Sequence, residues 1–296
     1  MKDIDYTYAV TNVRAKETEL KSKSFFERLA ADETSEEISD YENILSETWD
    51  YLSGIAPDKT ALEFLIVRND FHNFKAVSKG LMAGVDGRKY CIAPSIIDID
   101  FLYESVQRKN FDSLPEWIGA AAESGYELLT STADGRLFDM FIDKASLEAM
   151  IHLAPENEFC RKLANETVVF ADIKLAKRLS GADENVLRYA FAECDGINTE
   201  ELAAAVMRGT ADSYIEACGY AELAEIKSLP ELEKECADRI MSLMSEAALI
   251  DFGIEPLVAY YCARKAEQRN LRLIANAGHA GLAQSAIKER MLRTYV

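Results

Sequence analysis

The sequence predicts an all-α protein, and three observations support this fold class. Apolar residues recur at helical spacing along most of the chain. Convincing strand alternation is absent, because the apolar runs at residues 90–92 and 95–100 are too short to build a sheet. A three-residue pattern, Asn or Asp followed by an apolar and then a basic residue, also occurs in three predicted helices that lie about a third of the chain apart.

The recurring pattern divides the chain into thirds. Its copies, separated by 99 and 98 residues, are Asn73-Phe74-Lys75, Asp172-Ile173-Lys174 and Asn270-Leu271-Arg272. Each copy places its Asn or Asp in a stripe of apolar and small residues, where an unpaired polar group would cost about 1–3 kcal/mol. We therefore predict three similar helical domains at residues 1–97, 98–197 and 198–296. The alternative is three unrelated amphipathic helices that each tolerate a polar residue.

Start and stop signals order the helices of the first domain. Asp3 or Asp5 can cap a long N-terminal helix, Ser53-Gly54 ends a second helix, and Pro57-Asp58 starts a third. The predicted order is helix 3–29, a polar break at 31–37, helix 41–52, a helix from 57 that carries Asn73, and a turn at 84–87.

The same signals order the other two domains. Gly181-Ala182-Asp183 and Asp195-Gly196 bound one helix, while residues 199–202 and Glu255-Pro256 start two others. Helices are predicted at residues 98–106, 115–129, 137–153, 156–179 and 183–195, from 199, at 220–226 and 233–250, and from 255 through Asn270.

Composition and charge argue against several classes of protein. The net charge of −18 at pH 7 disfavours nucleic acid as a partner, because phosphate contacts need a basic surface. The first ten residues carry acids where a signal peptide needs an apolar core, and no run of about 20 apolar residues exists, so no direct membrane insertion is expected. Six scattered cysteines without a C-x-x-C pair indicate reduced thiols in a cytosolic protein.

The basic residues gather near the C-terminus. Residues 264–296 hold seven Lys and Arg but only two Glu, a local net charge of +5, so the remaining residues carry −23. Such asymmetry fits either a docking surface for an oppositely charged partner or a solvated helix end.

The sequence assembles no recognisable active site. Phosphate-binding and nucleophile motifs are absent. None of His72, His152 and His279 follows a Glu by three residues, as di-iron carboxylate proteins require. Glu148 and His152 could share a helix face as a metal pair, and residues 98–100, the nearest approach to an acidic magnesium cluster, fit a helix start better. We expect no catalytic residue, cofactor or metal.

The basic member of each triplet is expected on a different side of its helix from the polar member. Lys75, Lys174 and Arg272 lie about 200° around the helix from the buried Asn or Asp. They should therefore face water or a neighbouring unit. His72, beside Asn73, is expected to satisfy a local hydrogen bond.

Three stretches, spread from one end of the chain to the other, carry a family resemblance. They are Tyr-Thr-Tyr-Ala-Val-Thr-Asn-Val-Arg-Ala at 6–15, Asp-Phe-His-Asn-Phe-Lys at 70–75, and the C-terminal Glu-Pro-Leu at 255–257 with Glu267, Asn270, Arg272, 287–290 and Tyr295-Val296. Together they resemble the C subunit of V-type and archaeal A-type ATPases and ATP synthases, the family that includes the d subunit of eukaryotic V-ATPases. The middle copy departs from the family pattern, with Val169 in place of an acid and Asp172 in place of Asn.

The resemblance implies a fold and a role. It implies a funnel of three similar helical domains around a pseudo-threefold axis. Such a protein is cytoplasmic and peripheral to the membrane: it sits on the membrane proteolipid ring and receives the foot of the central stalk, without catalysing a reaction. Whether the ring moves protons or sodium stays open, as does the direction of ATP turnover. The alternatives are a helical-repeat scaffold of another complex and a carboxylate-metal enzyme.

Overall fold

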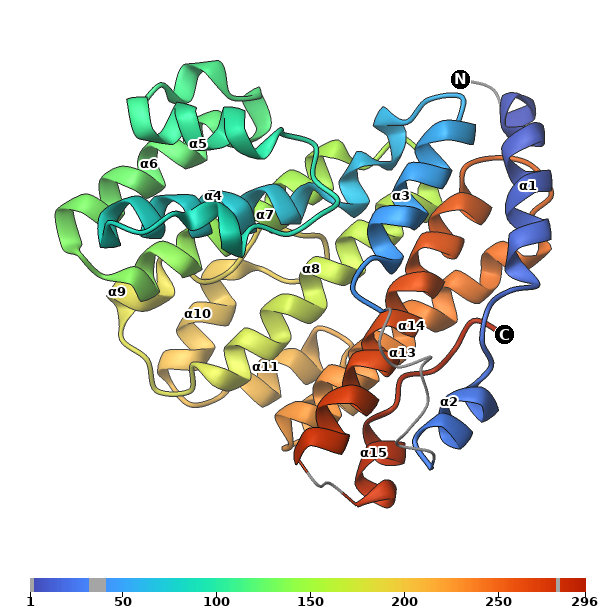
Figure 1. The fold of residues 1–296 in the computed structure, drawn as a ribbon. Helices are drawn as coiled ribbons and strands as arrows, with labels where there is room; N and C mark the ends of the chain where they lie inside the picture. The colour runs from blue at the N-terminus through green and yellow to red at the C-terminus, as the bar shows by residue number, and fades with distance from the viewer. Residues whose placement is uncertain (1–2, 32–40, 281–282) are drawn as a thin grey trace. The chain divides into compact units, whose positions relative to one another are not determined.

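Helices make up most of the chain in the computed structural model, which describes residues 3–31, 41–280 and 283–296, without the side chains of 278–280 (Figure 1). No strand forms within those ranges; Cys194 and Ile197 make an isolated antiparallel bridge. The all-α prediction is confirmed. The predicted polar break at 31–37 lies, except for Ala31, outside the described residues. The chain divides into two compact units, residues 61–225 and residues 1–60 with 226–296.

The unit at residues 61–225 contains the first two triplets. Its α-helices are α4 (Val67–Ala83), α5 (Ile99–Arg108), α6 (Glu116–Thr132), α7 (Gly135–Leu153), α8 (Glu158–Arg178), α9 (Glu184–Leu187), α10 (Thr199–Met207), α11 (Ala211–Ala217) and α12 (Ala221–Glu225), with 3-10 turns η3 (Thr60–Leu65), η4 (Gly87–Tyr90) and η5 (Phe111–Ser113). Short polar side chains begin several of them by accepting hydrogen bonds from free N–H groups of the first turn: Asp98, Asp134, Asn157, Asp183 and Asn198.

Aromatic side chains fill the centre of this unit. Helix α4 packs against α7, and α6 packs against α7. The buried ring of Phe74 on α4 lies 6.0 Å from the ring of Phe138 on α7 and 6.3 Å from that of Phe111 on η5. These edge-on and tilted contacts fix α4, and with it the first triplet, in the core.

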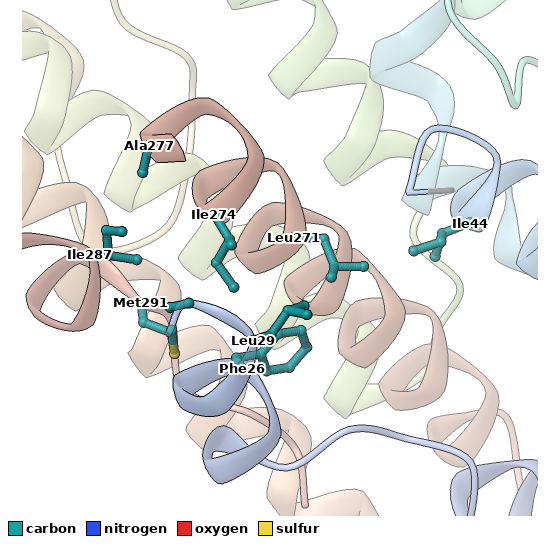
Figure 2. Close-up of a cluster of buried hydrophobic side chains, with 9 residues drawn as sticks. Phe26, Leu29, Ile44, Leu271, Ile274, Ala277, Ile287 and Met291 are labelled. Carbon is teal, nitrogen blue, oxygen red and sulfur yellow. The ribbon is translucent and has the colours of Figure 1, made fainter. Parts of the chain in front are cut away.

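The other unit brings the two ends of the chain together. It contains η1 (Asp3–Tyr6), α1 (Thr7–Glu17), α2 (Lys23–Leu29), α3 (Ile44–Ile55), α13 (Leu229–Glu246), η6 (Ala247–Leu249), α14 (Glu255–Ala280) and α15 (Gln284–Arg290). Helix α14 contacts α1, α2, α3, α13 and α15. Figure 2 shows Phe26 and Leu29 of α2 packed with Leu271 and Ile274 of α14 and with Met291, beyond α15. The long α14 is therefore the axis of this unit.

The predicted helix at residues 3–29 is wrong in one respect, because it is broken in the middle. Helix α1 ends at Glu17, and α2 begins at Lys23 after an extended Ser22. The main-chain N–H of Lys21 donates to the buried carboxylate of Glu267 on α14 instead of continuing the helix. A tertiary hydrogen bond thus outweighs local helix propensity at this point.

Two further predicted boundaries differ from the structure by more than five residues. The helix that carries Asn73 begins at Val67, after η3, and not at Pro57. The predicted helix at 183–195 shrinks to the four residues of α9. Beyond α9 the backbone is non-helical and forms hydrogen bonds with side chains of α8, described below.

The same order of elements occurs three times. A long helix is followed by a short helix and then by a non-helical stretch, which we name a return segment. The three sets are α4, η4 and residues 91–97; α8, α9 and residues 188–198; and α14, α15 and residues 291–296. Each long helix carries one triplet, so the triplets and return segments recur together.

Candidate functional site

Asn73 holds the first return segment through two hydrogen bonds to one residue. Its side chain is fully buried on α4. Its amide Nδ2 donates to the carbonyl of Ile92 at 3.0 Å, and its Oδ1 accepts from the N–H of Ile92 at 2.8 Å. A side-chain amide carries one donor side and one acceptor side, so it can satisfy both backbone groups of one residue. We name this reciprocal arrangement a clamp.

Two neighbouring side chains of α4 extend the first clamp. Asn69 donates to the carbonyl of Pro94 at 2.8 Å. The buried carboxylate of Asp70 accepts from the N–H of Ile96 at 3.1 Å and from that of Ile97 at 2.8 Å. One face of α4 therefore supplies the hydrogen bonds that the return segment would otherwise find in a sheet.

Asn270 repeats the clamp on α14. Its fully buried amide donates to the carbonyl of Leu292 at 3.1 Å and accepts from the N–H of Leu292 at 2.8 Å. The partner lies 22 residues along the chain, compared with 19 residues for Asn73. Two positions with the same sequence pattern thus have the same hydrogen-bond geometry.

Asp172 makes only half of a clamp on α8. It is fully buried, and its Oδ1 accepts from the N–H of Ala192, 20 residues on, at 3.2 Å. Its Oδ2 is buried and has no hydrogen-bond partner. Two turns earlier on α8, Asn165 makes a full clamp with Asp195, donating to its carbonyl at 3.1 Å and accepting from its N–H at 2.7 Å.

Sequence reasoning missed Asn69 and Asn165. Both are amides inside long helices, where Asn is a poor helix former. Asn69 lies one turn before Asn73, and Asn165 two turns before Asp172, and this spacing is the signal that could have found them.

Each of the three triplet helices buries one carboxyl group near its clamp. Three residues before the clamp position stand Asp70, Val169 and Glu267, all buried. Where that residue is an acid, the clamp residue is the neutral Asn73 or Asn270; where it is Val169, the clamp residue is the acid. Two ionised carboxyl groups buried one helical turn apart would repel each other. Each helix avoids this repulsion because only one of its two positions holds an acid.

Burial governs the ionisation of these acids. Desolvation raises the pKa of Asp70 to about 6, although the N–H groups of Ile96 and Ile97 oppose the shift. Desolvation raises the pKa of Asp172 to about 8, because one N–H of Ala192 compensates less. Burial also raises the pKa of Glu267, against the opposing effects of the Lys21 N–H and Arg264. A buried carboxyl group that accepts hydrogen bonds from fewer N–H groups keeps its proton to a higher pH.

The middle residues of the triplets pack into the cores. Phe74 and Ile173 have no exposed surface, and Leu271 is buried in the cluster drawn in Figure 2. Because an apolar residue follows each clamp residue directly, packing fixes the rotation of the helix and with it the direction of the amide or carboxyl group.

The basic residues of the triplets lie toward the outside of their helices. Lys75 pairs with Asp143 of α7 at 2.6 Å, and the guanidinium of Arg272 lies 5.9 Å from the ring centroid of Tyr41. Lys174 is half-buried and also has interactions. His72, next to Asn73, lies 3.2 Å from the carbonyl of Tyr90 through its Nε2.

The N-terminal motif contributes a second set of tertiary bonds. The Nη2 atom of Arg14 on α1 donates to the carbonyls of Ala247 at 2.7 Å and Ile250 at 2.8 Å, while Nη1 pairs with Glu17 at 2.8 Å. The Arg14 guanidinium therefore ties α1 to the loop between α13 and α14, because its forked donors reach two carbonyls at once.

The basic C-terminal region forms a stripe on α14. Lys265, Arg269 and Arg272 are exposed and lie at helical spacing, and we name them the basic stripe. The acid within this stretch, Glu267, is buried on another side of the helix and paired with Arg264. The exposed face of α14 therefore presents cationic groups on a chain that is acidic as a whole.

Neither metal ligation nor membrane spanning is visible in the part of the chain that the structure describes. Within it, no group of three or more His, Cys, Asp or Glu residues is placed to hold a metal ion. No helix there combines the length and apolarity needed to cross a bilayer. Glu148 forms an ion pair with Lys144 at 3.7 Å and accepts a weak hydrogen bond from the N–H of Glu193. The side chain of His279 is not among those that the structure describes.

The fold and the clamps define an all-α protein whose buried polar positions bind its own backbone at three related places. Comparison with known proteins gives the family. The family described as "ATP synthase (C/AC39) subunit" matches residues 42–290, so the chain belongs to that family and is a subunit of a rotary ATPase. It is similar to the C subunit of the V-type sodium ATPase of Enterococcus hirae, with 22% identity over 323 aligned positions that cover 96% of this chain and 97% of the relative.

Proposed function

We propose that the chain is a non-catalytic rotor subunit that couples the central stalk of a V/A-type ATPase to its membrane proteolipid ring. The family match over residues 42–290 carries the proposal. The Enterococcus hirae relative, whose name specifies a V-type sodium ATPase, is similar along almost its whole length. In this role the protein transmits torque for ATP-linked ion transport, proton or sodium, and is peripheral to the membrane through its partners.

The hydrogen-bonded return segments support a mechanical role. A protein that transmits torque must resist deformation, and non-helical stretches are normally the soft parts of a helical protein. Here α4, α8 and α14 each hold such a stretch through buried side chains. The triplet residues, from Asn73 to Arg272, are therefore proposed as the structural motif of a threefold repeat.

The recurrence of long helix, short helix and return segment also supports the predicted three-domain funnel. We keep the domains at 1–97, 98–197 and 198–296 as part of the proposal. Small-angle X-ray scattering of the purified protein is the test, because a hollow cone and a solid bundle of equal mass differ in their distance distributions. A scattering profile of a solid bundle would contradict the funnel but would leave the family assignment intact.

The basic stripe on α14 is the proposed contact for an acidic surface of a stalk or ring partner. Opposite charges steer association and raise its rate, and the effect weakens with salt. A triple variant, Lys265→Glu, Arg269→Glu and Arg272→Glu, should reduce recovery of one or both of these partners in a pull-down analysed by mass spectrometry. Wild-type binding should weaken as salt increases.

A control variant with the same change in net charge separates local contact from general repulsion. Lys59, Arg136 and Arg208 are exposed basic residues outside α14. Replacing these three by Glu should leave partner recovery near the wild-type level. Equal losses in both triple variants would remove the stripe from the proposal, and failure of the wild type to recover stalk and ring proteins would favour a scaffold of another complex.

A further inference from the structure

The half clamp of Asp172 on α8, here named the middle clamp, lacks one hydrogen-bond donor that the clamps of Asn73 and Asn270 have. In the clamps of Asn73 and Asn270, the amide nitrogen donates to the carbonyl of the same residue whose N–H the amide oxygen accepts. Asp172 has an oxygen, Oδ2, where each asparagine has its donor nitrogen. That oxygen is buried without a partner. An ionised carboxylate cannot donate, whereas a protonated one carries a single O–H donor.

We propose that Asp172 is a protonated carboxylic acid at neutral pH, and that its Oδ2–H completes the middle clamp by donating to the carbonyl of Ala192. The protonated carboxyl group then makes the same donor and acceptor hydrogen bonds as an asparagine amide, but only while the proton is bound. When solvent base removes that proton, the donor is lost and an ionised carboxylate remains in an apolar site. The return segment around Ala192 consequently loosens at alkaline pH, while the amide clamps of Asn73, Asn165 and Asn270 do not respond.

The charged groups around Asp172 favour the neutral form. Helix α7 presents Lys144, which would stabilise a carboxylate, but Lys144 is paired with Glu148 at 3.7 Å. Glu148 and Glu193 both disfavour ionisation. The Cys194 thiol of the return segment also interacts with Asp172. On the helices packed against α8, Asp212 of α11 is paired with Lys177 at 2.8 Å, and Glu200 and Glu201 are exposed in the first turn of α10.

The apolar packing of the site supports the same conclusion. Val168 on α8, Leu147 on α7 and Ala192 in the return segment form one buried cluster. The residue one turn before Asp172 is Val169, where the other triplet helices have Asp70 and Glu267. Desolvation is accordingly the largest cause of the raised pKa of Asp172, about 8. The inference concerns the folded chain alone and does not depend on the proposed role in a rotary ATPase.

Infrared difference spectroscopy tests the protonation directly. At pH 6.5, wild-type protein minus Asp172→Asn should show the carbonyl band of a protonated carboxylic acid, and the band should disappear with a midpoint near pH 8. The exposed Asp112→Asn variant is the matched control and should give no such band. A wild-type spectrum without the band at pH 6.5 would overturn the proposal.

The pH dependence of stability gives a second, independent test. The pKa of a buried acid such as Asp172 is higher in the folded protein than in the unfolded protein, where it is near 4. The stability of the folded protein therefore falls as pH rises from the lower to the higher of these two values. The unfolding equilibrium constant of the wild type relative to Asp172→Asn should therefore rise about tenfold per pH unit up to pH 8 and then level off. Parallel wild-type and variant profiles would contradict the proposal.

Loosening of the return segment is measured at Cys194. Its thiol is half-buried, and burial raises its pKa to about 12, so local opening of the segment should speed its alkylation. Between pH 7 and 9, labelling of Cys194 should increase more steeply in the wild type than in Asp172→Asn, with Cys91 beside the Asn73 clamp unaffected by the substitution. If Asp172→Asn does not fold, carbon-13 titration of the wild-type aspartate carboxyls decides: no resonance with a midpoint above pH 7 would refute the proposal.

Discussion

Asn270 and Leu292 join the longest helix to the last residues of the chain through a reciprocal pair of hydrogen bonds, 3.1 Å and 2.8 Å long. Both partners are buried, so neither water nor another backbone group replaces the amide. Asn73 and Ile92 repeat the same geometry in the other unit. Their energetic weight can be measured by substitution.

Asn270→Ala should destabilise the protein by about 2–4 kcal/mol, because it leaves a buried N–H and a buried carbonyl of Leu292 unpaired. Chemical denaturation with urea at pH 7 measures the change. Asn276→Ala, at an exposed position on the same helix, is the control and should stay within about 0.5 kcal/mol of wild type. Similar losses in both variants would mean that the hydrogen bonds of the clamp contribute no specific stabilisation.

Val169 and Asp172 should show strong coupling. Val169→Asp alone places two buried carboxyl groups one turn apart and should cost more than about 3 kcal/mol. Combined with Asp172→Asn, it recreates the acid-to-asparagine spacing of Asp70 and Asn73, and the double variant should recover roughly 2 kcal/mol of that loss. A double-mutant cycle measures the coupling free energy, and strictly additive effects would contradict the one-carboxyl explanation.

Arg14 should be sensitive even to conservative replacement. Arg14→Lys removes the fork that reaches the carbonyls of Ala247 and Ile250, and it should cost roughly 1–2 kcal/mol. Hydrogen exchange should accelerate in the loop between α13 and α14. Lys16→Ala removes an exposed pair with Glu19 and a cation 5.9 Å from the ring centroid of Tyr51, and should change stability by less than about 1 kcal/mol. Unchanged loop exchange in Arg14→Lys would show that the carbonyl contacts do not hold the loop.

Gly80 and Gly54 should respond to alanine with opposite signs. A Cβ atom at Gly80 would lie 2.6 Å from the Cα atom of Gly87, where α4 and η4 pack backbone against backbone. Gly80→Ala should therefore destabilise by about 1–3 kcal/mol and disturb the segment that Asn73 holds. Gly54, inside α3, has no heavy atom within 4 Å of such a Cβ, so Gly54→Ala should stabilise by about 0.5–1 kcal/mol. Thermal unfolding distinguishes the two, and a stable Gly80→Ala variant would disprove the close packing.

Asp70 should produce its own pH window, below that of Asp172. Its folded-state pKa of about 6 exceeds the ordinary value of 3.8, so the folded state binds more protons than the unfolded state between those values. Its contribution to stability is therefore full below pH 4 and is lost as pH rises to 6, with a slope of about −1.4 kcal/mol per pH unit. In urea melts from pH 4 to 8, the stability difference between wild type and Asp70→Asn should change only below pH 6. A difference in slope above pH 6 would count against this assignment.

Much of the architecture follows from local patterns. The all-α class came from apolar periodicity, and α7 and α8 lie within two residues of the predicted 137–153 and 156–179 helices. The failures came where tertiary contacts outweigh local preference. The helix predicted at 3–29 breaks because the N–H of Lys21 bonds to Glu267, and the one predicted at 183–195 stops early because Asp172 and Asn165 hold the backbone beyond it.

By itself, the sequence determined the helical class, the position of the three triplets and the burial expected of their Asn and Asp residues, since all three depend on spacing along one helix. Only the tertiary structure decided which backbone groups those residues bind, because Ile92, Ala192 and Leu292 lie about 20 residues beyond them, with no pattern of their own. The same holds for the unpartnered oxygen of Asp172, whose chemistry depends on the folded surroundings that exclude water from it.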